Sequence, residues 1–237
     1  MTKPSLIIKA IISITIVWSF SVCADHSVDA DPFENLNRKV FSFNKYLDDY
    51  IARPAAKFYV AVTPEPIEKG VSNFFDNLGE ITNIFNAVLQ AKFSQAVKDS
   101  GRFTINTTLG VAGVFDVAKS FGLRKSEGED FGQTLGKWGV PEGPYVMLPF
   151  LGPTTFRDGP ARLIDDLTDP LDYLNKNSEK AAATVVKLID TRASLLEYDS
   201  MLAGDSYMLV RDVYLQKRAY AVSDGAVEDE FDELDDY

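Results

Sequence analysis

The side chains that most often carry out catalysis are scarce in this sequence. Among 237 residues, His26 is the only histidine and Cys23 is the only cysteine. A Ser-His-Asp or Cys-His arrangement therefore lacks its members in the body of the chain. A zinc site with the usual nitrogen and sulfur ligands lacks them as well. We expect no nucleophilic catalysis of these kinds, no metal and no other cofactor.

Paired carboxylates are the next candidates, because two of them can share the acid and base roles of a reaction. Asp48 and Asp49 are adjacent, and so are Asp165 and Asp166. Neighbouring residues of a helix point about 100° apart, so neither pair converges on one substrate atom. We expect both pairs to be solvated at the protein surface.

Two further patterns bear on an enzymatic function. Gly139 and Gly143 stand among apolar residues and prolines, without the lysine that a phosphate-binding loop requires. An exported hydrolase that uses carboxylates, for instance Asp116 or Asp158, is an alternative with little support from residue type or spacing. We therefore expect a protein that is not an enzyme.

The N-terminus has the three parts of an export signal. Lys3 and Lys9 supply positive charge without any acid, residues 10–20 are apolar, and small residues stand at the ends of 22–24. An apolar run of about eleven residues is too short to span a bilayer, which takes about 20. We expect residues 1–24 to be a signal peptide and the rest of the chain to be exported.

Cys23 admits two ways of processing that signal. A bacterial lipoprotein is cut just before the cysteine, which is then acylated, but the preceding residue is normally Gly, Ala or Ser and here is Val22. Cleavage after Ala24, with Val22 and Ala24 at the two recognition positions, fits at least as well. Cys23 is thus a candidate lipid-attachment site, and both alternatives stay open.

Charge is distributed unevenly along the chain. The formal net charge is −11, and residues 224–237 alone hold eight acids and no base. This acidic balance argues against a nucleic-acid partner, which needs a basic patch. We expect residues 223–237 to form a disordered acidic tail.

Most of the chain has the periodicity of helices, with apolar residues at spacings of three and four. We expect helices over residues 32–50, 67–78, 81–89, 94–105, 161–167, 179–202 and 207–221, of which 179–202 is the longest, and a short helix or turn over 55–62. No stretch alternates with period two for long enough to predict a strand. The sequence therefore predicts a single, mainly α domain. In its last helix, Arg211, Lys217 and Arg218 should face outward.

Two segments do not follow this periodicity. Residues 130–158 place glycines and prolines among large apolar side chains, so they are an irregular segment buried against protein or lipid. Residues 105–123 are apolar, rich in small residues and too short to span a bilayer. For that second segment, a re-entrant hairpin beside a cavity and a buried turn in an ordinary core are equal alternatives.

With these residues assembled, the chain resembles the MlaA/VacJ family of Gram-negative outer-membrane proteins over residues 31–221. The matching motifs are Asp31-Pro32-Phe33-Glu34, Asn37-Arg38, Phe43-Asn44, Arg53-Pro54, Asn73-Phe74, Arg102-Phe103, Asn106-Thr107, residues 109–118, residues 131–136, Trp138-Gly139-Val140, Gly143-Pro144-Tyr145, Leu148-Pro149 and Arg157-Asp158. No single motif is specific, whereas so many in one order are.

The resemblance implies a ring-like assembly of amphipathic helices at residues 31–222, monotopic in the inner leaflet of the outer membrane and beside trimeric porins. In that family the ring encloses a channel through which misplaced phospholipids leave the outer leaflet for a soluble periplasmic carrier, which maintains lipid asymmetry. A hairpin beside the channel and an aromatic first helix belong to this path. Their counterparts here are Leu109, Gly110, Val111, Gly113, Val114 and Phe115 for the hairpin, and Phe43 and Asn44 for the helix.

An alternative to this function is a soluble periplasmic module that binds lipid or protein, in which the Gly/Pro segment is ordinary core. Arg102 and Arg157 could each meet a lipid phosphate. We expect each instead to form an ion pair with a nearby carboxylate.

Overall fold

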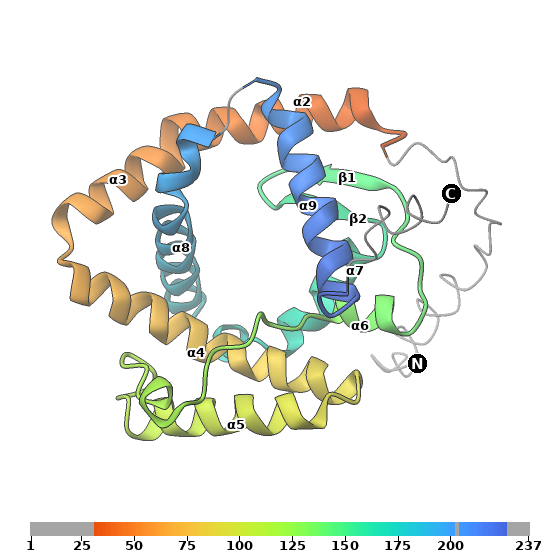
Figure 1. Cartoon of the computed structure of the whole chain (residues 1–237). Helices are drawn as coiled ribbons and strands as arrows, with labels where there is room; N and C mark the ends of the chain where they lie inside the picture. Colours follow the sequence, from red (N-terminus) through yellow and green to blue (C-terminus); the bar gives the residue numbers. More distant parts are fainter. Residues whose placement is uncertain (1–30, 202–203, 227–237) are drawn as a thin grey trace, which may run out of the picture. The chain divides into compact units, whose positions relative to one another are not determined.

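The computed structural model describes residues 31–201 and 204–226 (Figure 1). The predicted signal peptide, with Cys23, and residues 227–237 of the predicted tail lie outside the described residues. The described residues belong to one compact unit, which begins at Asp31.

Helices fill the first half of this unit. In chain order they are α2 (Glu34–Leu47), the π-helical turn η1 (Asp48–Ala52), α3 (Arg53–Val62), α4 (Glu65–Leu89), α5 (Phe93–Thr108) and the 3-10 turn η2 (Ala118–Phe121). Pro54 lacks the N–H that a continuous α-helix would bond, and the wider π turn comes just before it. Pro64, in an extended conformation, separates α3 from α4.

The second half mixes short elements with two longer helices. In order these are α6 (Phe131–Lys137), β1 (Tyr145–Leu148), β2 (Gly152–Thr155), α7 (Asp158–Asp165), the 3-10 turns η3 (Asp166–Thr168) and η4 (Pro170–Tyr173), α8 (Asn177–Ser194), η5 (Leu196–Met201) and α9 (Ser206–Val222). The prediction of a mainly α fold is confirmed.

Two helices differ from the prediction. Helix α4 runs unbroken through Gly79, where the sequence predicts a break, and with 25 residues it is the longest described helix. A glycine inside a helix costs only about 1 kcal/mol relative to alanine, and the burial of Asn77 and Glu80 on either side holds the helix together. Helix α8 ends at Ser194 and a 3-10 turn follows, so the prediction of one helix over 179–202 is wrong at its C-terminal end.

Residues 130–158 are not irregular throughout, which corrects the prediction for this segment. They contain α6 and a two-stranded antiparallel sheet, in which Tyr145 pairs with Thr155 and Leu148 with Gly152. Each strand has four residues, too few for an alternating pattern to stand out in the sequence. The glycines and prolines that forbid a long helix here are also the signal of the turn between the strands.

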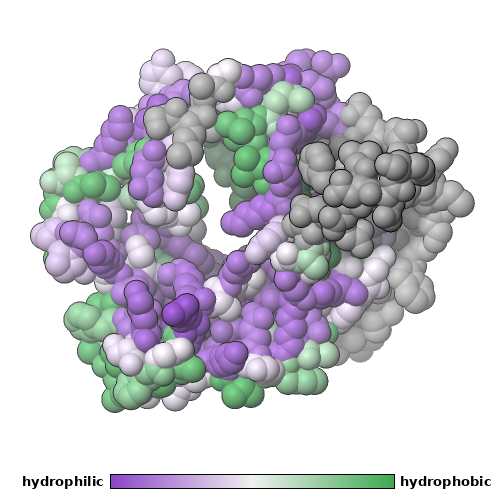
Figure 2. All heavy atoms as spheres, in the orientation of Figure 1, coloured by the Kyte–Doolittle hydropathy of each residue, from purple (hydrophilic) through white to green (hydrophobic). Residues whose placement is uncertain are grey.

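The elements of this unit contact one another in a closed circuit. Helix α2 joins α3 through η1, both α3 and α4 contact α8, and α4 contacts α6. Helix α6 contacts α9, α9 contacts β2, and β1 contacts α2, which closes the circuit. Figure 1 shows these elements around a central opening, and the space-filling view in Figure 2 shows a gap between the atoms at the same place. The predicted ring-like arrangement is confirmed for this unit.

Polar rather than apolar side chains make up most of the buried set. One small apolar cluster centres on Tyr145, Met147 and Tyr207, whereas Glu80 and Asp99 are among the polar residues that are almost fully buried. Large apolar side chains are exposed along the first half of the unit, at Tyr46, Tyr50, Ile51, Phe58, Val62, Ile67, Phe93, Val97, Leu109, Val111 and Phe115. Within the described ranges, no helix has both the length and the apolarity to cross a bilayer.

Candidate functional site

The predicted hairpin begins at the C-terminus of α5 and folds back on it. The N–H of Gly113 donates to the carbonyl of Asn106 (2.8 Å), and the N–H of Phe115 donates to the carbonyl of Gly110 (2.9 Å). Residues 111–113 all have positive φ, between +54° and +93°. A residue with a side chain costs about 1–2 kcal/mol in this left-handed region. The hairpin is therefore a strained reversal that its surroundings must hold.

Close approach requires glycine at two positions of the hairpin. A Cβ on Gly110 would lie 2.2 Å from the carbonyl oxygen of Phe115 and 2.5 Å from that of Asn106. A Cβ on Gly113 would lie 2.5 Å from the Cβ of Asn77 on α4. A larger residue at either position moves the backbone or α4, so these glycines serve the shape of the turn itself.

One stripe of α4 holds the hairpin. Asn73 donates from Nδ2 to the carbonyl of Val114 (3.1 Å), and Asn77 donates from Nδ2 to Oγ1 of Thr107 (2.9 Å). Gly70 leaves room for Val114, since a Cβ there would lie 3.0 Å from its Cγ1. These three α4 residues follow one another at spacings of three and four, which places them on one face of the helix.

A buried ion cluster fixes the two ends of the hairpin. Arg102 is 4% exposed and lies 3.2 Å from a carboxylate oxygen of Glu80 and 3.2 Å from one of Asp116. Asn106 donates to the same Asp116 oxygen (3.0 Å) and accepts from the N–H of Ala118 (2.8 Å). Burial alone would raise the pKa of Asp116, but the Asn106 hydrogen bond and the Arg102 charge lower it. The expected ion-pair role of Arg102 is confirmed.

The apolar side chains of the hairpin lie on its exposed side. Leu109, Val111 and Phe115 are 62%, 65% and 59% exposed. Backbone and polar groups thus hold the segment, while its apolar side chains are free to contact an apolar surrounding. That the hairpin borders a channel stays a prediction.

The first helix meets the turn between β1 and β2 through Phe43 and Asn44. Asn44 donates to the carbonyl of Leu148 and accepts from the N–H of Phe150, both at 2.9 Å. The Phe43 and Phe150 rings meet edge to face, with centroids 5.4 Å apart. Phe150 has a φ of +64° and is 77% exposed, so Asn44 stabilises a strained turn with an exposed aromatic tip. The sequence does not single out Phe150, whose signal is the Gly/Pro turn in which it lies.

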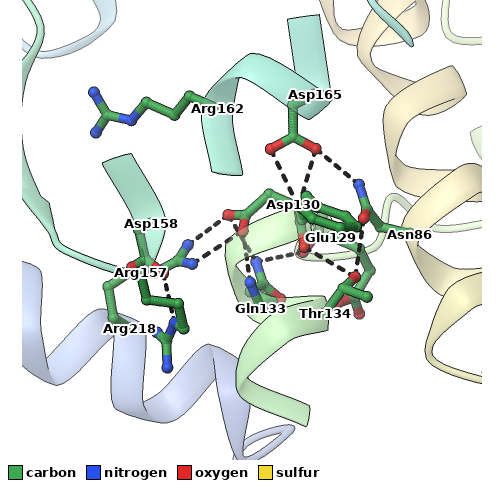
Figure 3. Close-up of polar contacts among 12 residues, drawn as sticks. Asn86, Glu129, Asp130, Gln133, Thr134, Arg157, Asp158, Arg162, Asp165 and Arg218 are labelled. Atoms are coloured by element: carbon green, nitrogen blue, oxygen red, sulfur yellow. Dashed lines mark hydrogen bonds and ion pairs between the residues drawn. The ribbon is translucent and has the colours of Figure 1, made fainter. Parts of the chain in front are cut away.

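Ion pairs join α6, α7 and α9 (Figure 3). Arg218 donates to Asp130 (2.9 Å), and its Nε lies 2.7 Å from Asp158. Asp158 also accepts from Arg157 (2.7 Å) and from the Tyr214 hydroxyl (3.1 Å). Burial alone would raise the pKa of both aspartates, but hydrogen bonds and charges from the arginines lower it. Arg157 forms the expected ion pair, whereas Arg218 faces inward, because acids from distant segments meet it there.

Asp165 lies in the same junction and is not the solvated residue that the sequence predicts. It accepts a hydrogen bond from Nδ2 of Asn86 (2.9 Å), as Figure 3 shows. It also accepts one from the N–H of Phe131 (3.0 Å). Burial raises the pKa of Asp165 to about 6. Asp166 is exposed, whereas Asp48 is half-buried and forms an ion pair with α8. Asp165 and Asp48 thus each join two elements of the fold.

Carboxylates do not gather into a metal site in the part of the chain that the structure describes. The arrangement is instead a closed circuit of amphipathic helices, held by buried ion pairs and carrying large solvent-exposed apolar side chains. Such a surface defines a class of protein that is built to contact an apolar surrounding.

Comparison with known proteins gives the particular family. The family described as MlaA lipoprotein matches residues 29–221. The chain belongs to the MlaA lipoprotein family, and the resemblance seen in its motifs is confirmed.

Several relatives match along most of their length. The intermembrane phospholipid transport system lipoprotein MlaA of Shigella flexneri is 38% identical, covering 86% of this chain and 84% of the relative. The protein of that name from Haemophilus influenzae is 31% identical, covering 87% and 84%. A solved structure on the structural basis for maintenance of bacterial outer membrane lipid asymmetry is 40% identical, with a TM-score of 0.73, covering 81% of this chain and 98% of that one.

Proposed function

We propose that this chain is the outer-membrane component of an intermembrane phospholipid transport system. In this role it takes phospholipids misplaced in the outer leaflet and passes them to a soluble periplasmic carrier, so that lipid asymmetry is maintained. The observation that carries the proposal is the family match over residues 29–221, together with relatives whose names state this transport.

The placement of polar and apolar groups supports passage of a lipid. Figure 2 shows hydrophilic residues over much of the visible face and a group of hydrophobic residues beside the opening. A phospholipid needs both surfaces, because its headgroup stays solvated while its chains gain about 0.8 kcal/mol for each CH₂ taken from water. Passage changes no covalent bond, so we propose a protein without enzymatic activity.

Two segments are proposed to contact the lipid. The hairpin of residues 109–115 exposes three large apolar side chains while α4 and α5 hold its backbone. The turn between β1 and β2 exposes Phe150 beside Phe43, and in Figure 1 this turn borders the opening. Asn44 sets the position of that turn.

The proposed setting is the periplasmic side of the outer membrane, with the chain monotopic in the inner leaflet and beside trimeric porins. Acylation of Cys23 is part of this proposal, because the relatives are named lipoproteins. The mass of the mature N-terminus tests it: an acylated Cys23 supports the anchor, and an N-terminus at Asp25 contradicts it.

Complementation tests the function. The chain is expressed in a Gram-negative strain from which the cell's own family member has been deleted. Phospholipid in the outer leaflet, measured by an amine-reactive label that does not cross the membrane, should fall to the level of the undeleted strain. An unchanged level, with the chain recovered in a salt-washed soluble fraction, would favour the soluble periplasmic module and contradict the proposal.

A further inference from the structure

A cavity of about 510 Å³ lies at the N-terminus of α5. Its walls come from residues 91–95, from Lys98 and Asp99 on α5, and from Arg124 and Ser126 in the segment that follows η2. This volume is typical of small-molecule sites, which measure about 300–1,000 Å³. The cavity lies at the opposite end of α5 from the hairpin, so it is separate from the segments already described.

One part of the cavity is positive. No side chain caps α5, so the N–H groups of its first turn, from Phe93 to Gln95, have no acceptor within the helix, and the helix dipole adds positive potential. Lys98 and Arg124 line the same cavity, and neither forms an ion pair within the described residues. Lys92 lines it too, but two carboxylates already bind its ammonium. Free N–H groups beside two cations are the elements of a phosphate site.

Another part of the cavity is negative. Asp99 is 1% exposed, and its Oδ1 has no hydrogen-bond partner among residues 31–201 and 204–226. Its Oδ2 accepts from Ser126 at 3.3 Å, while the nearby Gln95 donates its amide to Glu129 (3.2 Å). Burial and the charge of Glu80 raise the pKa of Asp99, while hydrogen bonds from Ser126 and Gln95 and the charge of Arg102 offset part of this rise. A cation beside the buried carboxylate of Asp99 would stabilise its charged form.

We propose that this cavity binds the headgroup of an aminophospholipid. The phosphate lies on the α5 N-terminus beside Lys98 and Arg124, and the ammonium lies on Asp99. In a phosphoethanolamine headgroup two carbon atoms separate the phosphate ester oxygen from the amine. This short separation suits the cavity, because the N–H groups that would bind the phosphate and the Asp99 carboxylate that would bind the amine share the first two turns of α5.

The surface beside the cavity favours a membrane lipid over a free phosphate compound. Phe93 lines the cavity and is 63% exposed, and Val97 is 71% exposed. These two residues are four apart and lie on one face of α5. Acyl chains can cover this face while the headgroup enters the cavity. The inference rests on the proposed function, since it needs a phospholipid membrane around the protein.

Calorimetric titration of the full chain in detergent micelles tests the proposal with headgroups that carry no acyl chains. We expect glycerophosphoethanolamine to bind about tenfold more tightly than glycerophosphoglycerol, which lacks the amine. Asp99→Asn should remove that preference and leave glycerophosphoglycerol unchanged. Lys98→Gln combined with Arg124→Gln should weaken both by about tenfold or more. Lys57→Gln, at an exposed lysine of α3 that pairs with no acid in the described part of the chain, is the matched control and should change neither.

Several outcomes would overturn the proposal. Equal affinity for the two headgroups, unchanged by Asp99→Asn, would reveal a site for anions alone. An effect of Lys57→Gln as large as that of the double variant would reveal unspecific charge attraction. Amide NMR shifts of Phe93 to Gln95 on adding glycerophosphoethanolamine to the wild-type chain need no variant, and their absence would also overturn it.

The headgroup measurements are independent of lipid transport. A chain that restores lipid asymmetry in cells but does not bind glycerophosphoethanolamine overturns the headgroup site and leaves the proposed function standing. A chain that binds this headgroup at Asp99 but fails to restore asymmetry supports the site and contradicts the function.

Discussion

Replacing Gly113 with alanine tests whether α4 holds the hairpin as the structure shows. Gly113 has a φ of +93°, where a side chain costs about 1–2 kcal/mol. The new Cβ would also lie 2.5 Å from the Cβ of Asn77, and overpacking of this kind costs about 1–3 kcal/mol. The expected loss in the free energy of unfolding is therefore about 2–5 kcal/mol.

Gly122→Ala is the matched control for this experiment. Gly122 has a φ of +80°, and a Cβ there would meet nothing within 4 Å, so only the backbone cost of about 1–2 kcal/mol applies. Denaturant unfolding of the full chain in one detergent measures both variants. Gly113→Ala should lose about 1–3 kcal/mol more than Gly122→Ala.

Two further readouts locate the effect in the hairpin. The N–H of Phe115, which bonds to Gly110, should exchange with solvent faster in Gly113→Ala and at the wild-type rate in Gly122→Ala. Asn77→Ala alone, which removes the hydrogen bond to Thr107, should also speed that exchange. Equal losses in the two single variants, with no change in exchange at Phe115, would refute the packing of the hairpin on α4.

Three other variants test the remaining contacts. Asn44→Ala removes two hydrogen bonds from the β1–β2 turn, so we expect a loss of about 1–3 kcal/mol and faster exchange of the Phe150 N–H, and an unchanged rate would contradict the role of Asn44. Arg218→Met leaves Asp158 with one arginine fewer and should cost about 3 kcal/mol in a denaturant melt, whereas a stability equal to wild type would show that this ion pair does not hold the circuit. Asp165, with its pKa raised to about 6, favours the folded state below about pH 4, and this contribution is lost as the pH rises through about 6. The free energy of unfolding of Asp165→Asn minus that of wild type should therefore be about 1–3 kcal/mol larger at about pH 8 than at about pH 4.5. A variant with the same pH profile as wild type would count against the burial of this carboxyl.

Periodicity located most helices because their apolar faces are long enough to show a spacing of three and four. Helix α9 matches its prediction almost to the residue. Gly79 misled the prediction because the cost of one glycine is small against the packing of a 25-residue helix. The strands β1 and β2 have four residues each, so no pattern in the sequence could show them.

The contacts of the site were less accessible to sequence reasoning than its location. Small residues indicate the hairpin, but the left-handed φ of Val111 is disfavoured for a β-branched residue and follows from the contacts around it. Arg218 meets Asp130 across 88 residues of sequence, and no local spacing reveals such a pair. Helical periodicity places a side chain on a face, whereas the fold decides what that face meets.

The distribution of side chains has a consequence for how the stability of this protein is defined. Among the described residues, charged groups such as Glu80 and Arg102 are buried while large apolar ones such as Phe58 and Val97 are exposed. The burial of apolar surface that drives folding is therefore not completed within one chain. In the proposed membrane setting lipid completes it, so an unfolding free energy measured in micelles belongs to the protein and its detergent together. In a bilayer, the thickness and lateral pressure of the lipid then act directly on the fold.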